Sequence, residues 1–178
     1  GLRRAAALVQ TLVRHHMVVV SGLAAGIDTA AHTVAIEAGG HTIAVLGSPL
    51  EVCYPTANAA LQARIAREYL VVSQFAAGTP VRPRNFPLRN LTMALLSHAT
   101  VIVEAGEASG TRYQGREALR LGRRLFLLES VATDPALSWP VEMIRAGARV
   151  LSRENLQASL DDIAAMARSA VPGRAAAR

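Results

Sequence analysis

The alternation of short apolar runs with helix-forming segments constrains the fold of this chain more than any other feature. The runs are residues 17–21, 42–46, 69–73, 100–104 and 124–128, and most are rich in β-branched residues. Each is followed by a segment typical of a helix. Continuous apolar strands are usually buried on both faces, and strands that alternate with helices form βαβ units. We therefore predict an α/β fold of the Rossmann-like, doubly wound type, with a mostly parallel sheet flanked by helices.

The predicted helices belong to a single domain. They span residues 2–16, 28–38, 57–68, 88–97, 110–121, 141–146 and 154–168, with an edge strand at 149–151 and a polar loop at 76–87. We expect residues 1–170 to form a single domain and residues 171–178 to form a disordered tail. A doubly wound domain normally opens on a strand, whereas this chain opens on a helix. An initial strand is therefore expected to be missing.

The charge of the chain allows a polyanionic partner. Its net charge is +6, and all 19 basic residues are arginine, whose planar fork matches phosphate oxygens. An arginine bias from a GC-rich genome explains the composition equally well. The single cysteine, Cys53, cannot form an internal disulfide, and no apolar run reaches the roughly 18 residues that span a bilayer. We expect a soluble, cytoplasmic protein without a membrane partner.

A glycine-containing turn follows the first strand. Ser21-Gly22 is separated from Gly26 by three residues, so the spacing is G-x-x-x-G and not the dinucleotide pattern G-x-G-x-x-G. Gly22 permits a positive φ and a close approach, and the helix start behind it directs N–H groups at an anion. Asp28 is expected to cap that helix. The turn is either a phosphate cradle or an ordinary strand-to-helix connection.

Two further segments are expected at the same edge of the sheet, because the carboxyl ends of parallel strands meet there. Ser109, Gly110 and Thr111 precede a helix and suit a phosphate or a ribose, or form an ordinary capped loop. The segment 82–90, which leads into the fourth predicted helix, holds three arginines and an aromatic side chain, which could bind a nucleic-acid backbone and stack a base. Its candidate residues are Arg82, Arg84, Phe86, Arg89 and Asn90.

Enzymatic patterns are scarce. No Cys/His cluster has metal-ligand spacing, G-x-S-x-G is absent, and no base follows Ser109 in sequence. His15 and His16 are expected at the surface, and the other histidines are expected to pack or to face water. We therefore expect no metal, no cofactor and no catalytic residue, and favour non-enzymatic binding over an enzyme.

Several segments in one order resemble the DprA/Smf family of DNA-processing proteins. They are SGLAAGIDTAAH (21–32), AVLG (44–47), VCYP (52–55), FPLRN (86–90) and VEA (103–105) with Ser109-Gly110. The resemblance covers about residues 1–130. It implies an extended Rossmann-like domain that binds single-stranded DNA, dimerises, and loads a RecA-type recombinase during natural transformation.

The chain departs from the family pattern at positions that bear on DNA. Ala25 stands where the family usually has an arginine, and Leu88 and Leu91 stand where basic residues usually flank the Arg-Asn pair. The family's initial strand and accessory domains are also absent from this sequence. Each missing arginine removes a phosphate contact.

The wider SLOG superfamily provides an alternative. Its LOG-type phosphoribohydrolases carry a catalytic glutamate at the position of Gln114, whereas Arg89-Asn90 and Gly110-Thr111 keep a similar spacing. Without that carboxylate the glycosidic bond should not be hydrolysed. The alternative function is thus binding or cleavage of a nucleotide derivative. A third is a scaffold that only dimerises.

These observations combine into one hypothesis, an anionic pocket at the carboxyl ends of the strands. Arg89 would fork onto a phosphate, the Gly22 turn and the Ser109–Thr111 helix start would donate N–H groups, and Phe86 would stack a base. The pocket would be lined by Ser21, Gly22, Gly26, Arg89, Asn90, Ser109 and Gly110, supported by Arg82 and Arg84.

Overall fold

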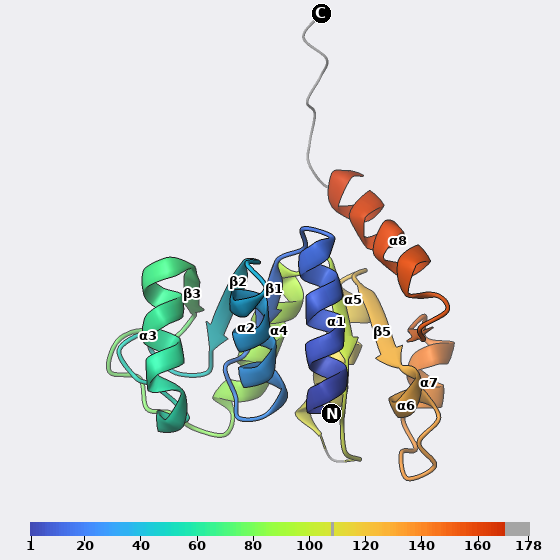
Figure 1. Ribbon diagram of the computed structural model, residues 1–178. Helices are drawn as coiled ribbons and strands as arrows, with labels where there is room; N and C mark the ends of the chain where they lie inside the picture. Colours follow the sequence, from blue (N-terminus) through green and yellow to red (C-terminus); the bar gives the residue numbers. More distant parts are fainter. Residues whose placement is uncertain (108, 170–178) are drawn as a thin grey trace, which may run out of the picture.

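The computed structural model describes residues 1–107 and 109–169, and it is built of parallel strands flanked by helices (Figure 1). Every strand pair is parallel. The predicted α/β class is confirmed. The strands are β1 (Val19–Ser21), β2 (Thr42–Leu46), β3 (Leu70–Ser73), β4 (Ala99–Ile102), β5 (Arg124–Leu128) and β6 (Arg149–Leu151). The helices are α1 (Leu2–Arg14), α2 (Ile27–Glu37), α3 (Ala59–Glu68), α4 (Asn85–Leu96), α5 (Gly110–Arg120), α6 (Glu129–Ala132), α7 (Pro140–Arg145) and α8 (Leu156–Ser169), with a 3-10 turn at Thr56–Asn58.

The strands form two separate sheets rather than one. The order is β1-β2-β3 in the first and β4-β5-β6 in the second. The register places Val20 beside Ile43 in the first sheet and Val101 beside Phe126 in the second. Within the described residues β1 and β4 are the facing edges of the two sheets, and neither pairs with the other. The continuous sheet that the sequence predicts is therefore interrupted at its centre.

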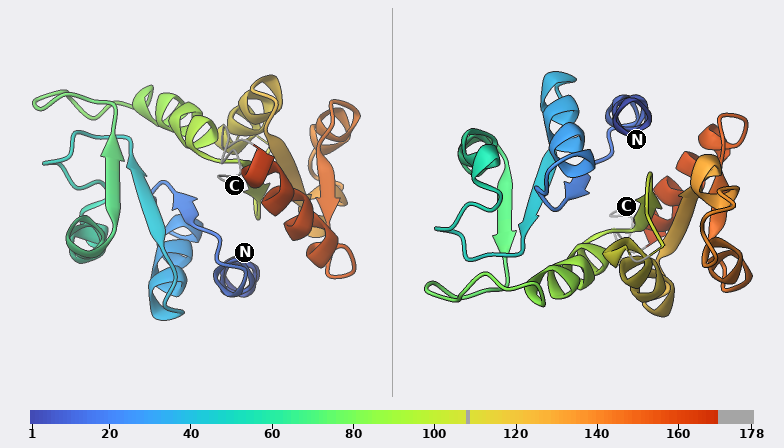
Figure 2. Two further views of the ribbon diagram at one scale, coloured as in Figure 1. Left: turned by 90° about the horizontal axis from the view of Figure 1, so that it is seen from above. Right: turned by 90° about the horizontal axis from the view of Figure 1, so that it is seen from below.

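Helices cover both faces of the strands. Helices α1, α2 and α3 lie side by side on one face, and α4 and α5 lie on the other (Figures 1 and 2). The first sheet packs on α2 and α3 through Leu46, Ile36 and Ile65, all nearly inaccessible to water. Burial of these aliphatic side chains is the main stabilising contribution.

The second sheet is covered on both faces by different helices. One face packs through Leu125 and Leu127 against the Trp139 and Met143 side chains, which belong to the segment around α7. The other face packs through Phe126 against α1 and α8. Helix α1 thus contacts both sheets, because its Val9 also packs on Val19 and on α2. This helix spans the interruption between them.

Two predicted boundaries differ from the structure near functional candidates. Phe86 and Pro87 were expected in a loop, whereas α4 begins at Asn85 and includes both. Proline is tolerated there because the first turn of a helix has no acceptor for its N–H. Helix α1 ends at Arg14 instead of residue 16, and His15 and His16 form the turn into β1.

The described residues contain neither a membrane-spanning helix nor a metal-binding cluster. No helix there is long and apolar enough to cross a membrane. The same residues contain no group of three or more His, Cys, Asp or Glu side chains that could hold a metal ion. The predicted tail, residues 171–178, lies outside the described residues.

Candidate functional site

The candidate residues lie at the carboxyl ends of the strands, as expected for a parallel sheet. Ser21 ends β1, the 22–26 loop leads into α2, and Ser109 to Thr111 open α5 after β4. Ser21 and Thr111 also line one cavity between the sheets. Arg89 and Asn90 reach the same edge from the first half of α4.

Three consecutive main-chain carbonyls of the 22–26 loop accept hydrogen bonds from side chains of the protein. Arg89 Nη1 donates to the Gly22 carbonyl, and Asn58 Nδ2 donates to the Leu23 carbonyl at 2.8 Å. The Ala24 carbonyl accepts from the Thr29 hydroxyl at 2.8 Å and from the Thr29 N–H at 3.2 Å. These hydrogen bonds hold the main chain of the loop in place.

The outward N–H groups belong to the exposed tip of the loop. Ala25 and Gly26 are exposed, and among the described residues their amides have no hydrogen-bond acceptor. They stand directly before α2, whose N-terminus carries a partial positive charge. This arrangement is a ready site for an anion such as phosphate.

Asp28 holds the loop closed instead of capping the helix. Its carboxylate accepts from the Ser21 hydroxyl at 2.7 Å and from the Ala24 N–H at 3.2 Å. The N-cap residue is Gly26, which has no side chain to offer. Asp28 therefore has a structural role, as expected. It joins the end of β1 to the loop, and it does not accept hydrogen bonds from the N–H groups of the first turn of α2, all of which the structure describes.

Arg89 is buried beneath the loop rather than exposed above it. Its guanidinium donates to the Gly22 carbonyl and, at 3.1 Å, to the Val45 carbonyl of β2, while Nε donates to Asn90 Oδ1 at 2.9 Å. Only 5% of the residue is exposed, and burial lowers the pKa of Arg89, partly offset by Asp28. Its donors are directed at main-chain carbonyls, so a direct contact with phosphate stays a prediction.

Gly22 is required for the packing of Arg89. A Cβ atom at Gly22 would overlap the Arg89 guanidinium. The expected positive φ falls elsewhere in the loop, on Gly26 (φ 91°) and on Leu23 (φ 58°). Leu23 adopts this uncommon conformation with its side chain fully buried in the core.

Phe86 forms one wall of a small pocket at the loop. Its ring lies over Gly47, where a Cβ atom would come within 2.8 Å of it, and 5.4 Å from the ring of Tyr54. Tyr54 is 55% exposed. The pocket has a volume of about 160 Å³ and is lined by Gly22, Ala24, Ala25, Tyr54, Pro55 and Phe86. Two aromatic rings therefore stand beside the unpaired N–H groups.

Arg82 and Arg84 are exposed on the segment that leads into α4. Neither makes an ion pair with any acidic group in the described part of the chain. Such side chains are free to contact a polyanion.

The start of α5 lies next to Asn90. Ser109 is the N-cap residue, and its hydroxyl oxygen accepts from the Thr111 N–H at 3.2 Å. A Cβ atom at Gly110 would lie 3.8 Å from Asn90 Nδ2. Asn90 therefore links the Arg89 cluster to this helix start.

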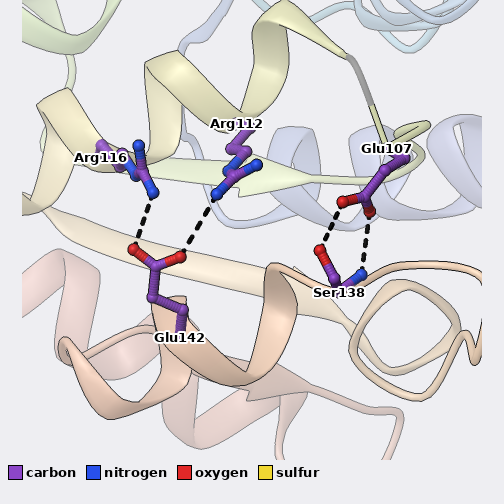
Figure 3. Close-up of polar contacts among 5 residues, drawn as sticks. All are labelled: Glu107, Arg112, Arg116, Ser138 and Glu142. Atoms are coloured by element: carbon purple, nitrogen blue, oxygen red, sulfur yellow. Dashed lines mark hydrogen bonds and ion pairs between the residues drawn. The ribbon is translucent and has the colours of Figure 1, made fainter.

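The loop before α5 is anchored to the segment around α7. Glu107 accepts from the Ser138 N–H at 2.9 Å and from the Ser138 hydroxyl, and these donors lower the pKa of Glu107 (Figure 3). In α7, Glu142 forms ion pairs with two arginines of α5, Arg116 at 2.7 Å and Arg112 at 3.4 Å (Figure 3). These contacts hold the Ser109 region in place.

The sequence left three contributors to this site without an assigned role. Asn58 and Thr29 tie down the loop carbonyls, and Tyr54 completes the aromatic pocket. Tyr54 stands in a motif, but no local pattern tells which distant ring it meets. The contacts of Asn58 and Thr29 follow only from the packing of α2 and α3.

A family model described as DNA recombination-mediator protein A matches residues 1–163. The DNA processing protein DprA of Streptococcus pneumoniae is 37% identical over 140 residues, which are 79% of this chain and 50% of that protein. Protein Smf of Synechocystis is 38% identical over 164 residues, 92% of this chain and 41% of that protein. The chain thus spans half or less of the length of these curated relatives.

A solved structure of a DNA processing protein A is also similar to this chain. DNA processing protein A from Helicobacter pylori superposes with a TM-score of 0.78 at 25% identity, over 92% of this chain and 74% of that one. That structure is described for its mode of binding single-stranded DNA.

Proposed function

Because the chain belongs to the DNA recombination-mediator protein A family, we propose that it binds single-stranded DNA and acts in DNA processing as a recombination mediator. The observation that carries the proposal is the loop at the end of β1, which presents unpaired N–H groups beside a pocket walled by two aromatic rings.

Each part of a nucleotide has a complementary group there. The N–H groups of Ala25 and Gly26 suit a phosphate, and the exposed side chains of Arg82 and Arg84 suit the phosphates that follow. The rings of Phe86 and Tyr54 suit a base, since base–aromatic stacking is tolerant of sequence. In this proposal Arg89 shapes the cradle from beneath.

The partners form a second part of the proposal. We propose a homodimer that engages a RecA-type recombinase in the cytoplasm. Exposed apolar side chains on α4 support self-association, because Leu88 is 44% and Leu95 is 48% exposed. Light scattering tests the dimer, and assembly of recombinase filaments on single-stranded DNA coated with its binding protein tests the mediator role.

Charge substitutions at Ala25 test the DNA site directly. Ala25 is exposed at the tip of the loop, so a new side chain there should leave the fold intact. Fluorescence anisotropy with a labelled oligo-dT at low salt should show that Ala25→Arg tightens binding and Ala25→Glu weakens it, each by about fivefold for one nearby charge. The same two substitutions at Ala38, exposed beyond the other end of α2, provide the matched control.

Equal affinities for Ala25→Arg, Ala25→Glu and the two Ala38 variants would contradict the assigned site. A parallel incubation with nucleoside monophosphates addresses the alternative of a nucleotide-cleaving enzyme. We expect no released base, because Gln114 supplies no carboxylate at the cavity that it lines with Thr111.

A further inference from the structure

Helix α5 carries a row of three arginines along one side. Arg112, Arg116 and Arg120 are spaced by four residues, so their side chains follow one another along the helix. Like charges at this spacing repel, which makes the row unfavourable without an anion beside it. Successive members are separated along the helix axis by the rise of four residues, about 6 Å. The row therefore has the linear form that suits the backbone of a polyanion.

Glu142 of α7 is the anion that the first two arginines share within the described residues. Its Oε1 accepts from Arg116 Nη2 at 2.7 Å, and its Oε2 accepts from Arg112 Nη2 at 3.4 Å (Figure 3). Arg120 pairs with Glu117 of its own helix instead. Arginine side chains recognise the oxygens of a carboxylate and of a phosphate with the same geometry. Glu142 thus occupies a place that fits a phosphate.

The contacts of Glu142 are weak ones. Its side chain is 57% exposed and that of Arg116 is 50% exposed, so water screens their attraction. The contact with Arg112 is long, and Arg112 Nε is buried without a hydrogen-bond partner among the residues that the structure describes. Exposed pairs of this kind contribute little to stability. A phosphate, which also brings a full negative charge and more acceptor oxygens, can replace the carboxylate.

Helix α7 does not depend on Glu142 for its position. The neighbouring side chains of Trp139 and Met143 are almost completely buried in the core of the second sheet. The contacts of Glu107 with Ser138 also tie the loop before α5 to this segment. The carboxylate of Glu142 can therefore leave the two arginines while α7 stays in place.

The row begins beside the candidate DNA site. Arg112 directly follows the Ser109–Thr111 helix start, which lies next to Asn90. The segment with Arg82 and Arg84 follows β3 in the first sheet, whereas α5 follows β4 in the second. The 22–26 loop follows β1, at the edge where the two sheets face one another. A strand bound at this loop thus has arginines on both sides.

We propose that Arg112 and Arg116 form a further phosphate subsite for the DNA strand, and that Glu142 occupies this subsite in the DNA-free protein. Binding then exchanges one anion for another: a phosphate takes the two guanidinium groups, and the carboxylate turns into water. Glu142 thereby disfavours small anions and favours a long strand, whose phosphates are tethered to those already held at the 22–26 loop. This inference rests on the proposed function.

Glu142→Gln tests the subsite. Fluorescence anisotropy with a labelled oligo-dT should show binding about fivefold tighter than in the parent chain, because two exposed ion pairs no longer have to be broken. Glu68→Gln is the matched control. Glu68 is also shared by two arginines, Arg64 and Arg67, but it lies at the end of α3, before the amino end of β3. Its replacement removes the same charge and should leave the affinity unchanged.

A double-mutant cycle separates the subsite from a general effect of charge. Arg112→Ala/Arg116→Ala should weaken binding, and the further change Glu142→Gln should then alter the affinity by less than about twofold. No tightening by Glu142→Gln in the parent chain would overturn the proposal. The same tightening in Glu68→Gln, or in the background without the two arginines, would overturn it as well.

Inorganic tripolyphosphate tests the subsite without DNA. In calorimetry, Glu142→Gln should bind it about fivefold more tightly than the parent chain, and replacement of Arg112 and Arg116 should remove this gain. If the gain is observed but the parent chain does not bind oligo-dT, the proposed function fails and the phosphate subsite stands. If the parent chain binds oligo-dT but neither probe responds to Glu142→Gln, the subsite fails and the proposed function stands.

Discussion

At Arg89 the guanidinium takes the place of water at two main-chain carbonyls, those of Gly22 and Val45. A buried cation is tolerated only when its donors are used, and here they connect the loop after β1 to β2. The side chain thereby fixes the position of the 22–26 loop, where the Ala25 and Gly26 N–H groups have no acceptor among the described residues. An arginine near an anion site can therefore act by fixing the position of the main chain and not by contacting the anion.

Substitution of Gly22 by alanine tests this role. The added Cβ would overlap the guanidinium, so Arg89 would have to leave its carbonyl partners. We expect the free energy of unfolding in urea to fall by about 2–3 kcal/mol, the value of lost hydrogen bonds to a buried charged group. Binding to oligo-dT should weaken as the loop loses its shape.

Gly106→Ala is the matched control for this variant. Gly106 lies in the loop after β4, where an added Cβ meets no atom within 4 Å. Its stability and affinity should stay near those of the parent chain. A Gly22→Ala variant as stable as Gly106→Ala would show that Arg89 does not hold the loop.

His32 makes stability depend on pH. The residue is fully buried, and its Nδ1 contacts the Thr42 hydroxyl at 2.7 Å. Burial lowers the pKa of His32 from 6.5 to about 4; the neighbouring Asp28 opposes this shift and Arg89 reinforces it. The unfolded chain therefore takes up a proton near pH 6.5, and the folded chain resists it down to about pH 4. Stability is complete above 6.5 and falls as the pH drops toward 4.

The expected loss between pH 7 and pH 5 is about 2 kcal/mol, measured as the free energy of unfolding in urea. His32→Gln should abolish most of this pH dependence while lowering stability at pH 7. His41→Gln removes an exposed histidine and should leave the pH dependence unchanged. If the free energy of unfolding changed equally with pH in the parent chain and in both variants, His32 would be ruled out as the source of the pH dependence.

At the scale of elements, apolar patterning predicted β2 and β5 residue for residue. These strands are buried runs flanked by glycine or polar residues, so local sequence sufficed. The start of α4 was wrong because Pro87 reads as a loop signal, although a first helical turn accepts it. Arg89 could not be placed from sequence, since its carbonyl partners lie 67 and 44 residues away.

The anchor between the α5 loop and α7 is also testable. Ser138→Ala removes the hydroxyl that Glu107 accepts from, so the loop that carries Ser109 and Gly110 should loosen. We expect faster amide exchange at Gly110 and about twofold weaker oligo-dT binding, with little change in global stability, because exposed polar pairs contribute little. Thr133→Ala, which removes another exposed hydroxyl close by on the chain, should change neither. Unchanged exchange at Gly110 in Ser138→Ala would contradict the anchor.

At the scale of the whole molecule, the doubly wound arrangement puts the candidate site at one end of the cavity between the two sheets, where Ser21 and Thr111 line it. Ligands of such folds bind beyond the carboxyl ends of the strands, where the strand order reverses. Here the reversal lies between β1 and β4. The sequence pattern indicated the fold class. The separation of the sheets could not be predicted, because the pattern does not say which edges pair.

The chain has a net charge of +6, and the salt dependence of binding shows which of its arginines meet DNA. For single strands the slope of log K against log salt is about −0.7 for each phosphate neutralised. If Arg82 and Arg84 each contact one phosphate, the variant Arg82→Ala/Arg84→Ala should flatten the slope by about 1.4.

The control variant is Arg145→Ala/Arg168→Ala, which removes the same charge from the last turns of α7 and α8, away from the strand ends. Its slope should match that of the parent. An equal flattening in both double variants would mean that DNA responds to overall charge alone, and not to the surface beside the 22–26 loop.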